Sequence, residues 1–325
     1  MELKSRARGS LLGLASGDAL GAPTEGMTRE AIAERWGRVD GFLDPDAAGT
    51  DDTEYAVLCA RGALRHGRAL TSDDVADLWL EALSVQDGGF AGAGFSEMVA
   101  LDNLRRGIRP PDSGERNDES WSDGAAMRAA PLGLLCPGDP VEAARLASVD
   151  AAVSHARDGV FAAEAVAAAV ATAVGGGDWR ESLAAGREAI PADSWTRRTV
   201  DRALLLVAEA DSVAAAETAL AERIPLLHYP WADAAPEALA LAFGLVAAHE
   251  GRLVDTVLAG VNIGRDSDTI AAMAGAICGA IHGEEAIPPL WRDTVRSVSG
   301  RCITATAGTD LIDLADALAE AGSLR

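Results

Sequence analysis

The sequence has almost no lysine, few aromatic residues and few cysteines. Lys4 is the only lysine among 325 residues, and Phe, Trp and Tyr together make up 4% of the chain. Without a lysine near a site, Schiff-base chemistry and phosphate binding by a P-loop lysine are excluded. The cysteines, Cys59, Cys136, Cys278 and Cys302, form no CxxC pair. We therefore expect free thiols in a reducing compartment, and neither a disulfide framework nor a zinc site.

Positive charge and long apolar runs are scarce as well. With 28 Lys+Arg against 50 Asp+Glu the formal net charge is −22, so the chain lacks the basic face that nucleic acid or an anionic membrane surface requires. The longest apolar stretches, such as 165–177 and 270–281, are shorter than a bilayer span. Gly13 and Asp18 interrupt the N-terminal apolar run. We expect no membrane segment and no signal peptide, and a cytoplasmic protein.

Helical periodicity dominates what is present. Ala- and Leu-rich segments carry charged residues three or four positions apart, whereas alternating β-branched and aromatic residues are nearly absent. The pattern predicts an all-α protein whose small side chains let helix axes approach closely. The predicted helices are 53–66, 72–84, 141–154, 162–174, 197–210, 213–224, 236–250, 253–261, 267–282 and 309–321.

Two segments rich in Gly, Pro, Asp and Ser, 87–94 and 109–123, are predicted to be loops that could border a cleft. Neither has the features of a domain linker, because helices with related motifs lie on both sides. No repeat of 20 to 50 residues is convincing, which argues against a solenoid. We therefore expect a single domain over residues 1–325.

Two short acidic segments, 49–54 and 262–269, each stand where a loop turns into an apolar helix. Asp, Ser and Thr are preferred N-caps and the helix dipole favours acids there, so capping explains either segment alone. Together they supply more carboxylates than capping needs. Because the segments are more than 200 positions apart, their meeting is a hypothesis. The residues concerned are Thr50, Asp51, Asp52, Asp266, Asp268 and Thr269.

Carboxylates gathered in one place repel each other unless cations neutralise them. Ligands that are all oxygen suit hard divalent ions such as Mg²⁺ or Mn²⁺, not zinc. Two such ions about 3.5–4 Å apart can share carboxylates, orient a substrate and activate a water. The acidic segments therefore predict a centre for two Mg²⁺ or Mn²⁺ ions.

Five motifs stand in order along nearly the whole chain. They are GSLLGLASGDALGAPTE at 9–25, GTDDTEYAV at 49–57, WSDGAAMRAAPLGLL at 121–135, SVDAAVSHARDGVFAAEA at 148–165 and NIGRDSDTIAAMAGAICGAIHG at 262–283. Together they make the chain similar to the ADP-ribosylglycohydrolase family, the all-α hydrolases that include dinitrogenase-reductase-activating glycohydrolase. The resemblance implies a compact orthogonal helical bundle and hydrolysis of the glycosidic bond of a ribose.

The resemblance also implies roles for single residues. Thr50, Asp51, Asp52, Asp266, Asp268 and Thr269 match the family's metal ligands. Glu25 resembles a carboxylate that contacts the metal centre or gates the substrate; without the family it reads equally as a solvated turn acid. Glu25, Asp51 and Asp52 are the candidate catalytic residues, although acid and base are not assigned separately.

Substrate-binding residues are implied in two further motifs. His155 matches a family histidine beside bound ADP-ribose, although a lone histidine before a helix is more often a cap or a satisfied core residue. Residues 122–128 match a loop whose backbone cradles ribose and phosphate. From the residues alone, a glycine followed by small residues at a helix start is a weak indication of an oxyanion site. Its candidate residues are Ser122, Asp123, Gly124 and Met127.

The sequence departs from the family pattern at two positions. The usual GNGAAMR has Asp123 in place of Asn, and the usual GGDSD has Arg265 in place of the second Gly. Arg265 is either a substrate-binding residue that holds a phosphate or carboxylate through two hydrogen bonds, or the partner of a nearby acid such as Asp123. These changes alter substrate recognition more than the reaction type.

Three functions remain open. The first is a metal-dependent hydrolase that removes ADP-ribose from a modified protein side chain, and the second acts on a small N-ribosyl or nucleoside-like metabolite. The third is a non-catalytic, crystallin-like member of the family. The complete sets of acidic ligands argue against the third, because a structural protein has no physical need for them. The aglycone and the oligomeric state are not specified by the sequence.

Overall fold

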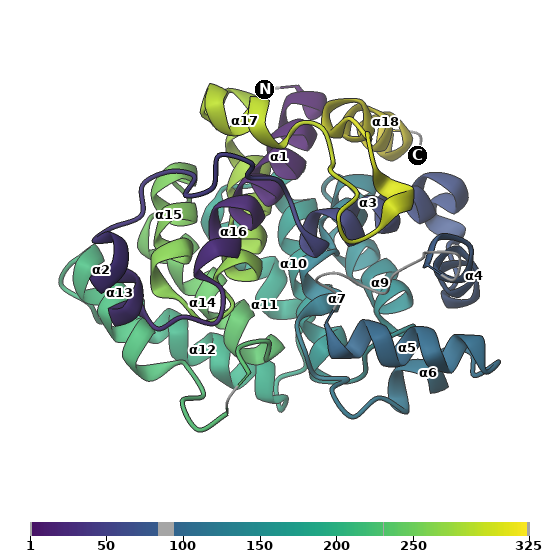
Figure 1. Cartoon of the computed structure of the whole chain (residues 1–325), viewed down its shortest axis with the longest axis horizontal. Coiled ribbons are helices and arrows are strands. Elements are labelled where there is room, and N and C mark those ends of the chain that lie inside the picture. The colour runs from purple at the N-terminus through teal and green to yellow at the C-terminus, as the bar shows by residue number, and fades with distance from the viewer. Residues whose placement is uncertain (1, 84–93, 230, 324–325) are drawn as a thin grey trace.

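The computed structural model describes residues 2–83, 94–229 and 231–323. Within these ranges the chain is built from helices joined by loops, with isolated β-bridges and no sheet, which confirms the predicted all-α class (Figure 1). The α-helices are α1 Leu3–Gly21, α2 Arg29–Trp36, α3 Asp51–His66, α4 Ser72–Leu83, α5 Phe95–Arg105, α6 Asp112–Glu115, α7 Gly124–Met127, α8 Ala130–Leu135, α9 Pro140–Ala151, α10 Asp158–Val174, α11 Trp179–Ala189, α12 Trp195–Ala208, α13 Val213–Arg223, α14 Ala235–Ala248, α15 Leu253–Ile263, α16 Ser267–His282, α17 Pro289–Val295 and α18 Leu311–Ser323. Short 3₁₀ turns lie at η1 Ala22–Thr24, η2 Gly67–Ala69, η3 Glu284–Ala286 and η4 Thr304–Thr306.

The centre of the bundle is the pair α1 and α16, which lie side by side (Figure 1). Glycines recur every fourth residue of α1 from Gly9 to Gly21. A Cβ atom at Gly13 would clash with the carbonyl of Gly275, and one at Gly21 would clash with the backbone of Asp268. The absence of side chains therefore lets the last turn of α1 lie directly on the first turn of α16.

Helix α1 is absent from the predicted set because its glycines and serines lower intrinsic helix propensity. Tertiary packing outweighs that cost, since almost the whole of α1 from Ala7 onward is buried. The other helices missing from the prediction are short or largely polar; they are α2, α5, α7, α8, α11 and α17. The predicted loop 109–123 contains one short helix, α6.

All ten predicted helices are present, with ends within four residues of the predicted ones where the structure describes them. Most of the predicted loop 87–94 lies outside the described residues. The four cysteines are buried free thiols, as expected. In the described part of the chain, no helix has the length and apolar character needed to cross a membrane.

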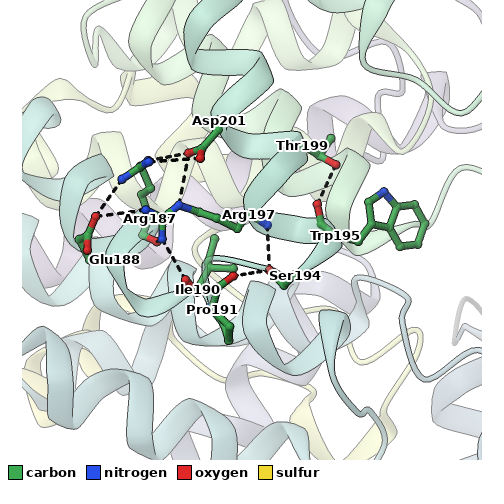
Figure 2. A network of polar contacts seen from close by, with 9 residues as sticks. All are labelled: Arg187, Glu188, Ile190, Pro191, Ser194, Trp195, Arg197, Thr199 and Asp201. Atoms are coloured by element: carbon green, nitrogen blue, oxygen red, sulfur yellow. Dashed lines mark hydrogen bonds and ion pairs between the residues drawn. The ribbon is translucent and has the colours of Figure 1, made fainter.

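Paired charges fix the turn between α11 and α12 (Figure 2). Arg187 donates from Nε and Nη2 to the two carboxylate oxygens of Asp201, at 2.6 and 3.2 Å. Arg197 donates from Nη1 to the carbonyls of Arg187 and Ile190, at 2.9 and 3.0 Å. Ser194 caps α12 by accepting a hydrogen bond from the Arg197 amide. We call the nine residues labelled in Figure 2 the α11–α12 network. This network fixes the first turn of α12, where Trp195 lies.

Candidate active site and metal centre

The two acidic segments meet where α1, α3 and α16 converge. Oxygens of Asp18, Asp52 and Asp268 lie within 4.8 Å of one another, and so do oxygens of Glu25, Asp266 and Asp268. Asp268 belongs to both triplets, so they form one continuous cluster. The close packing of α1 on α16 explains the meeting, because it carries residues from three distant parts of the chain to one point.

Further carboxylates extend this cluster. Asp51 starts α3. Asp123 and Asp233 lie beside Asp266, and burial, followed by the charge of Asp266, raises the pKa of both. We call the whole group the acidic centre. Its members are Asp18, Glu25, Asp51, Asp52, Asp123, Asp233, Asp266 and Asp268.

Four buried oxygens of the acidic centre have no hydrogen-bond partner among the described residues. They are Asp52 Oδ1, Asp123 Oδ2, Asp233 Oδ1 and Asp268 Oδ1, and we call them the open oxygens. Burial, reinforced by neighbouring carboxylates, raises the pKa of Asp52, Asp123 and Asp268 well above the ordinary value, and that of Asp233 to about 6. Buried carboxylates in this state call for a cation, and an oxygen-only donor set fits a hard divalent metal ion.

Asp18 is a residue of the centre that sequence reasoning did not assign. Its carboxylate accepts hydrogen bonds from the Thr50 amide at 2.8 Å, the Thr50 hydroxyl at 2.6 Å and the Thr53 amide at 3.0 Å. It therefore satisfies the free N–H groups at the start of α3 from another helix. One signal was present in the sequence, because Asp18 is a single acid inside the apolar run of α1.

The remaining predicted metal ligands lie in the same place. Burial raises the pKa of Asp51 well above the ordinary value, and the Asp18 charge adds to the effect. Asp266 is 7% exposed and stands directly before α16. Burial raises the pKa of Asp52, and Thr269, in the first turn of α16, partly offsets that rise. The structure thus brings all six predicted ligands together.

Glu25 lies at the solvent-exposed edge of the acidic centre, just after η1. Partial desolvation, together with the charges of Asp266, Asp18 and Asp233, raises its pKa to about 7. The carboxylate is thus both accessible and close to the buried acids. This placement favours the functional reading of Glu25 over that of a solvated turn acid.

The turn that begins at Ser122 lies opposite the segment that carries Asp233. The Asp123 amide donates to the Asp233 carbonyl at 3.0 Å, and the Ala235 amide donates to the Trp121 carbonyl at 3.2 Å. A Cβ atom at Gly124 would clash with the buried carboxylate of Glu97, which explains the glycine. Asp123 therefore lies in the acidic centre, and its backbone is held by the segment that leads into α14.

Met127 belongs to the hydrophobic core and is 4% exposed. The next residue, Arg128, is buried as well and donates to Asp150 at 2.7 Å and to the Gly124 carbonyl at 2.9 Å. Its guanidinium also lies 3.5 Å from Glu97, a second buried acid that sequence reasoning missed. Arg128 and Glu97 thus pack against Gly124 on the core side of the turn 122–128.

His155 is fully buried, and both ring nitrogens are hydrogen-bonded. Nε2 lies 2.9 Å from the Ser122 hydroxyl and Nδ1 lies 2.7 Å from the Ser154 hydroxyl. Burial, with the nearby charge of Arg128, lowers the pKa of His155 well below its ordinary value, so the ring is neutral at pH 7. The geometry is that of a satisfied core histidine that fixes Ser122.

Arg265 forms an ion pair, but the partner is not Asp123. Its Nε donates to Glu237 Oε1 at 2.6 Å and its Nη2 donates to Glu237 Oε2 at 3.3 Å. The Glu237 side chain is 1% exposed and that of Arg265 16%. The interpretation of Arg265 as half of an ion pair is therefore right in kind, with a different acid. Glu237 carried no signal in the sequence beyond its place in the first turn of a helix.

An aromatic cavity opens beside the acidic centre. It has a volume of about 360 Å³ and is lined by Trp121, Trp195, Leu226, His228 and Tyr229. The rings of Trp121 and Tyr229 meet edge to face with centroids 5.1 Å apart. No local sequence pattern indicated this cavity, because Trp195 and Tyr229 lie far from Trp121 along the chain.

Comparison with known proteins accounts for the whole chain. The family profile described as ADP-ribosylglycohydrolase matches residues 1–325. The uncharacterized protein YegU of Escherichia coli is 29% identical over 321 residues, covering 90% of this chain and 92% of that protein. ADP-ribosyl-[dinitrogen reductase] glycohydrolase of Rhodospirillum rubrum is 32% identical over 163 residues, or 46% of this chain and 51% of that protein.

A solved structure agrees. A chain of an ADP-ribosylglycohydrolase-related protein complex superimposes with a TM-score of 0.69 at 27% identity, covering 99% of both chains. The fold and the order of the motifs thus match the family from end to end, as the sequence resemblance implied. The chain belongs to the ADP-ribosylglycohydrolase family.

Proposed function

We propose that this protein is a cytoplasmic hydrolase that uses two divalent cations, Mg²⁺ or Mn²⁺, to cleave a ribosyl glycosidic bond and remove ADP-ribose from a modified protein side chain. The single observation that carries the proposal is the set of open oxygens in the acidic centre. Buried carboxylates without counter-charge destabilise a protein, so a function must compensate for them. A single domain over residues 1–325 performs the reaction.

Six residues would hold the cations: Thr50, Asp51, Asp52, Asp266, Asp268 and Thr269. Bound cations supply the positive charge that orients ribose hydroxyls and acidifies a water. Asp18 is the positioning residue for this set, because its hydrogen bonds fix Thr50 and the first turn of α3. Thr269 would join the set from the first turn of α16.

The chain's carboxylates move the protons of the reaction. Water adds to the anomeric carbon of the ribose and the bond to the aglycone nitrogen or oxygen breaks, through a transition state of oxocarbenium character. One carboxylate among Glu25, Asp51 and Asp52 accepts a proton from the water, and the leaving atom gains a proton. Glu25 is suited to exchange that proton with solvent, because it is exposed and its pKa without metal is about 7.

The aromatic cavity supports ADP-ribose as the substrate. Trp121, Trp195 and Tyr229 offer apolar ring faces on which a nucleobase can stack, and Trp121 lies two positions before Asp123 in the chain. The turn formed by Ser122, Asp123, Gly124 and Met127 would hold the ribose and phosphate, with His155 fixing Ser122 from the core side. The Rhodospirillum rubrum relative is named for an ADP-ribosylated protein, which favours the same substrate class here.

The second candidate is a hydrolase of a small N-ribosyl or nucleoside-like metabolite. Two features favour it. Asp123 adds a carboxylate where the family pattern has an amide, and Glu237 neutralises the guanidinium of Arg265. Neither residue then attracts a diphosphate, whereas an open carboxylate oxygen readily accepts hydrogen bonds from sugar hydroxyls. The crystallin-like alternative is weaker, because a non-catalytic protein gains nothing from open oxygens.

Thermal unfolding with Mg²⁺ or Mn²⁺ and with ADP-ribose, ribose or adenosine separates these candidates. We expect the metal to raise Tm and ADP-ribose to raise it further, because each binds only the folded state. Release of ADP-ribose from an ADP-ribosylated protein, followed by mass spectrometry, completes the test. A metal effect without an ADP-ribose effect would favour the small metabolite. Absence of any metal effect would return both acidic segments to helix caps.

A further inference from the structure

The ion pair of Arg265 and Glu237 holds a segment that forms one wall of the site. Glu237 Oε2 accepts a hydrogen bond from the Leu226 amide at 2.5 Å, and Arg265 Nη2 donates to the Trp231 carbonyl at 3.1 Å. The pair thus grips the chain on both sides of residue 230. We call residues 226–229 and 231–233 the aromatic segment.

The aromatic segment reaches both parts of the candidate site. Tyr229 packs between Trp121 and Trp231, with ring centroids 5.1 and 5.4 Å away. At its end, the Asp233 carbonyl accepts the hydrogen bond from the Asp123 amide. A shift of this segment would therefore move the aromatic wall and the Asp233 carboxylate together.

The backbone of Arg265 is fixed independently of its side chain. Its amide donates to the Met27 carbonyl at 2.9 Å, and its carbonyl accepts from the Gly26 amide at 2.8 Å. Its φ of +63° is in the left-handed region, which favours the glycine of the family pattern. The left-handed backbone conformation of Arg265 costs free energy, and the hydrogen bonds of its guanidinium to Glu237 and the Trp231 carbonyl offset that cost.

We propose that Arg265 and Glu237 form a clasp that positions the aromatic segment against the acidic centre, and thereby sets the affinity for the base-bearing part of the substrate. The inference rests on the proposed function for the ligand that it names. Arg265 is then a positioning residue and does not bind the substrate phosphate. Its guanidinium uses three of its five N–H donors on Glu237 and the Trp231 carbonyl. The Glu237 carboxylate also neutralises its charge, which weakens the attraction for a phosphate.

The test measures binding of ADP-ribose and of ribose to the Mg²⁺-loaded protein by calorimetry, in wild type and in R265A, R265K, E237Q and R265A/E237Q. The double variant guards against misfolding of R265A, which leaves the Glu237 carboxylate buried and unpaired. R145A is the matched control, since Arg145 also donates two hydrogen bonds to one carboxylate, that of Glu142, and neither residue lines the aromatic cavity.

We expect R265A and E237Q to weaken ADP-ribose binding by roughly tenfold, with ribose binding and the Mg²⁺-induced rise in Tm unchanged. R265K should lie between them and wild type, and R145A should match wild type. Gln at 237 has one acceptor oxygen where Glu237 uses two, so E237Q opens one side of the clasp.

Two results would overturn the clasp. If E237Q tightens ADP-ribose binding while R265A weakens it, the guanidinium binds phosphate directly. If hydrogen exchange of amides in residues 226–233 is as slow in R265A and E237Q as in wild type, the pair does not hold the segment. The exchange measurement decides this point even if wild type binds no ADP-ribose, an outcome that would reject the proposed function alone.

Discussion

The α11–α12 network and the acidic centre use the same residue types in opposite ways. In the network, the carboxylate of Asp201 pairs with the guanidinium of Arg187, and Arg197 donates hydrogen bonds to two backbone carbonyls (Figure 2). In the acidic centre, carboxylates face each other and four open oxygens remain. Selection for folding alone produces the first arrangement. The second persists in a folded protein when a ligand completes it.

Burial sharpens the contrast. The side chains of Asp201 and Glu188 in the network are 40% and 71% exposed, so water screens their ion pairs and each contributes little to stability. Asp52 and Asp268 are 1% and 4% exposed and gain no such screening. Substitutions in the two regions should therefore separate stability from function.

The largest effect is expected from D52N/D268N. Loss of two candidate ligands should lower hydrolytic activity by about 100-fold or more, since changes in outer-shell residues alone commonly cost 10- to 100-fold. The metal-induced rise in Tm should disappear, while far-ultraviolet circular dichroism stays that of wild type. A fully active double variant would contradict the metal centre.

R197A should produce the reverse pattern. It removes donors to the carbonyls of Arg187 and Ile190, and we expect it to lower the free energy of unfolding by about 1–3 kcal/mol. Urea unfolding measures this loss. Mg²⁺ binding and turnover at a permissive temperature should stay at the wild-type level, and a parallel loss of both would mean that the two regions are not separable.

The acidic centre should make the metal-free protein less stable as pH rises. Carboxyl groups whose pKa is raised on folding bind more protons in the folded state than in the unfolded state. Their contribution is therefore complete below the unfolded pKa near 4 and is lost as pH rises through the folded values, about 6 for Asp233 and about 7 for Glu25. Between pH 5 and 8, Tm should fall by about 2 °C or more.

Saturating Mg²⁺ is the control for this pH dependence. A cation replaces protons as the counter-charge, so the fall in Tm between pH 5 and 8 should flatten. D52N/D268N should flatten it in part without metal. Equal slopes in the metal-free wild type, the double variant and the Mg²⁺-loaded protein would show that the acidic centre does not set the slope.

The smallest effect is expected from W195A, because Trp195 links the α11–α12 network to the aromatic cavity and touches no member of the acidic centre that the structure records. Its backbone carbonyl accepts a hydrogen bond from Thr199 in the α11–α12 network, and its side chain lines the aromatic cavity. Removing the ring should weaken adenosine or ADP-ribose binding by roughly fivefold, or about 1 kcal/mol, with ribose binding unchanged. Equal weakening of ribose would argue for a general loss of structure.

Much of this arrangement could be predicted from the sequence, because it depends on local patterns. The periodicity of α16 and the acidic residues before it define both the helix and its candidate ligands. Helix α1 escaped prediction because glycine is locally unfavourable in a helix, and only contact with α16 reverses that. The partner of Arg265 escaped it because Glu237 lies 28 positions away, on a helix whose location no local pattern gives.

The sequence by itself determined the helical class, the two sets of candidate acidic ligands and the family, because helix periodicity, capping residues and motif order are local properties of the chain. The tertiary structure alone decided that the two sets meet, that Asp18 anchors one of them, and that Glu237 holds Arg265. These depend on close packing between helices that are distant in the chain. The reason for the glycines of α1 becomes evident only when α16 is seen to lie against them.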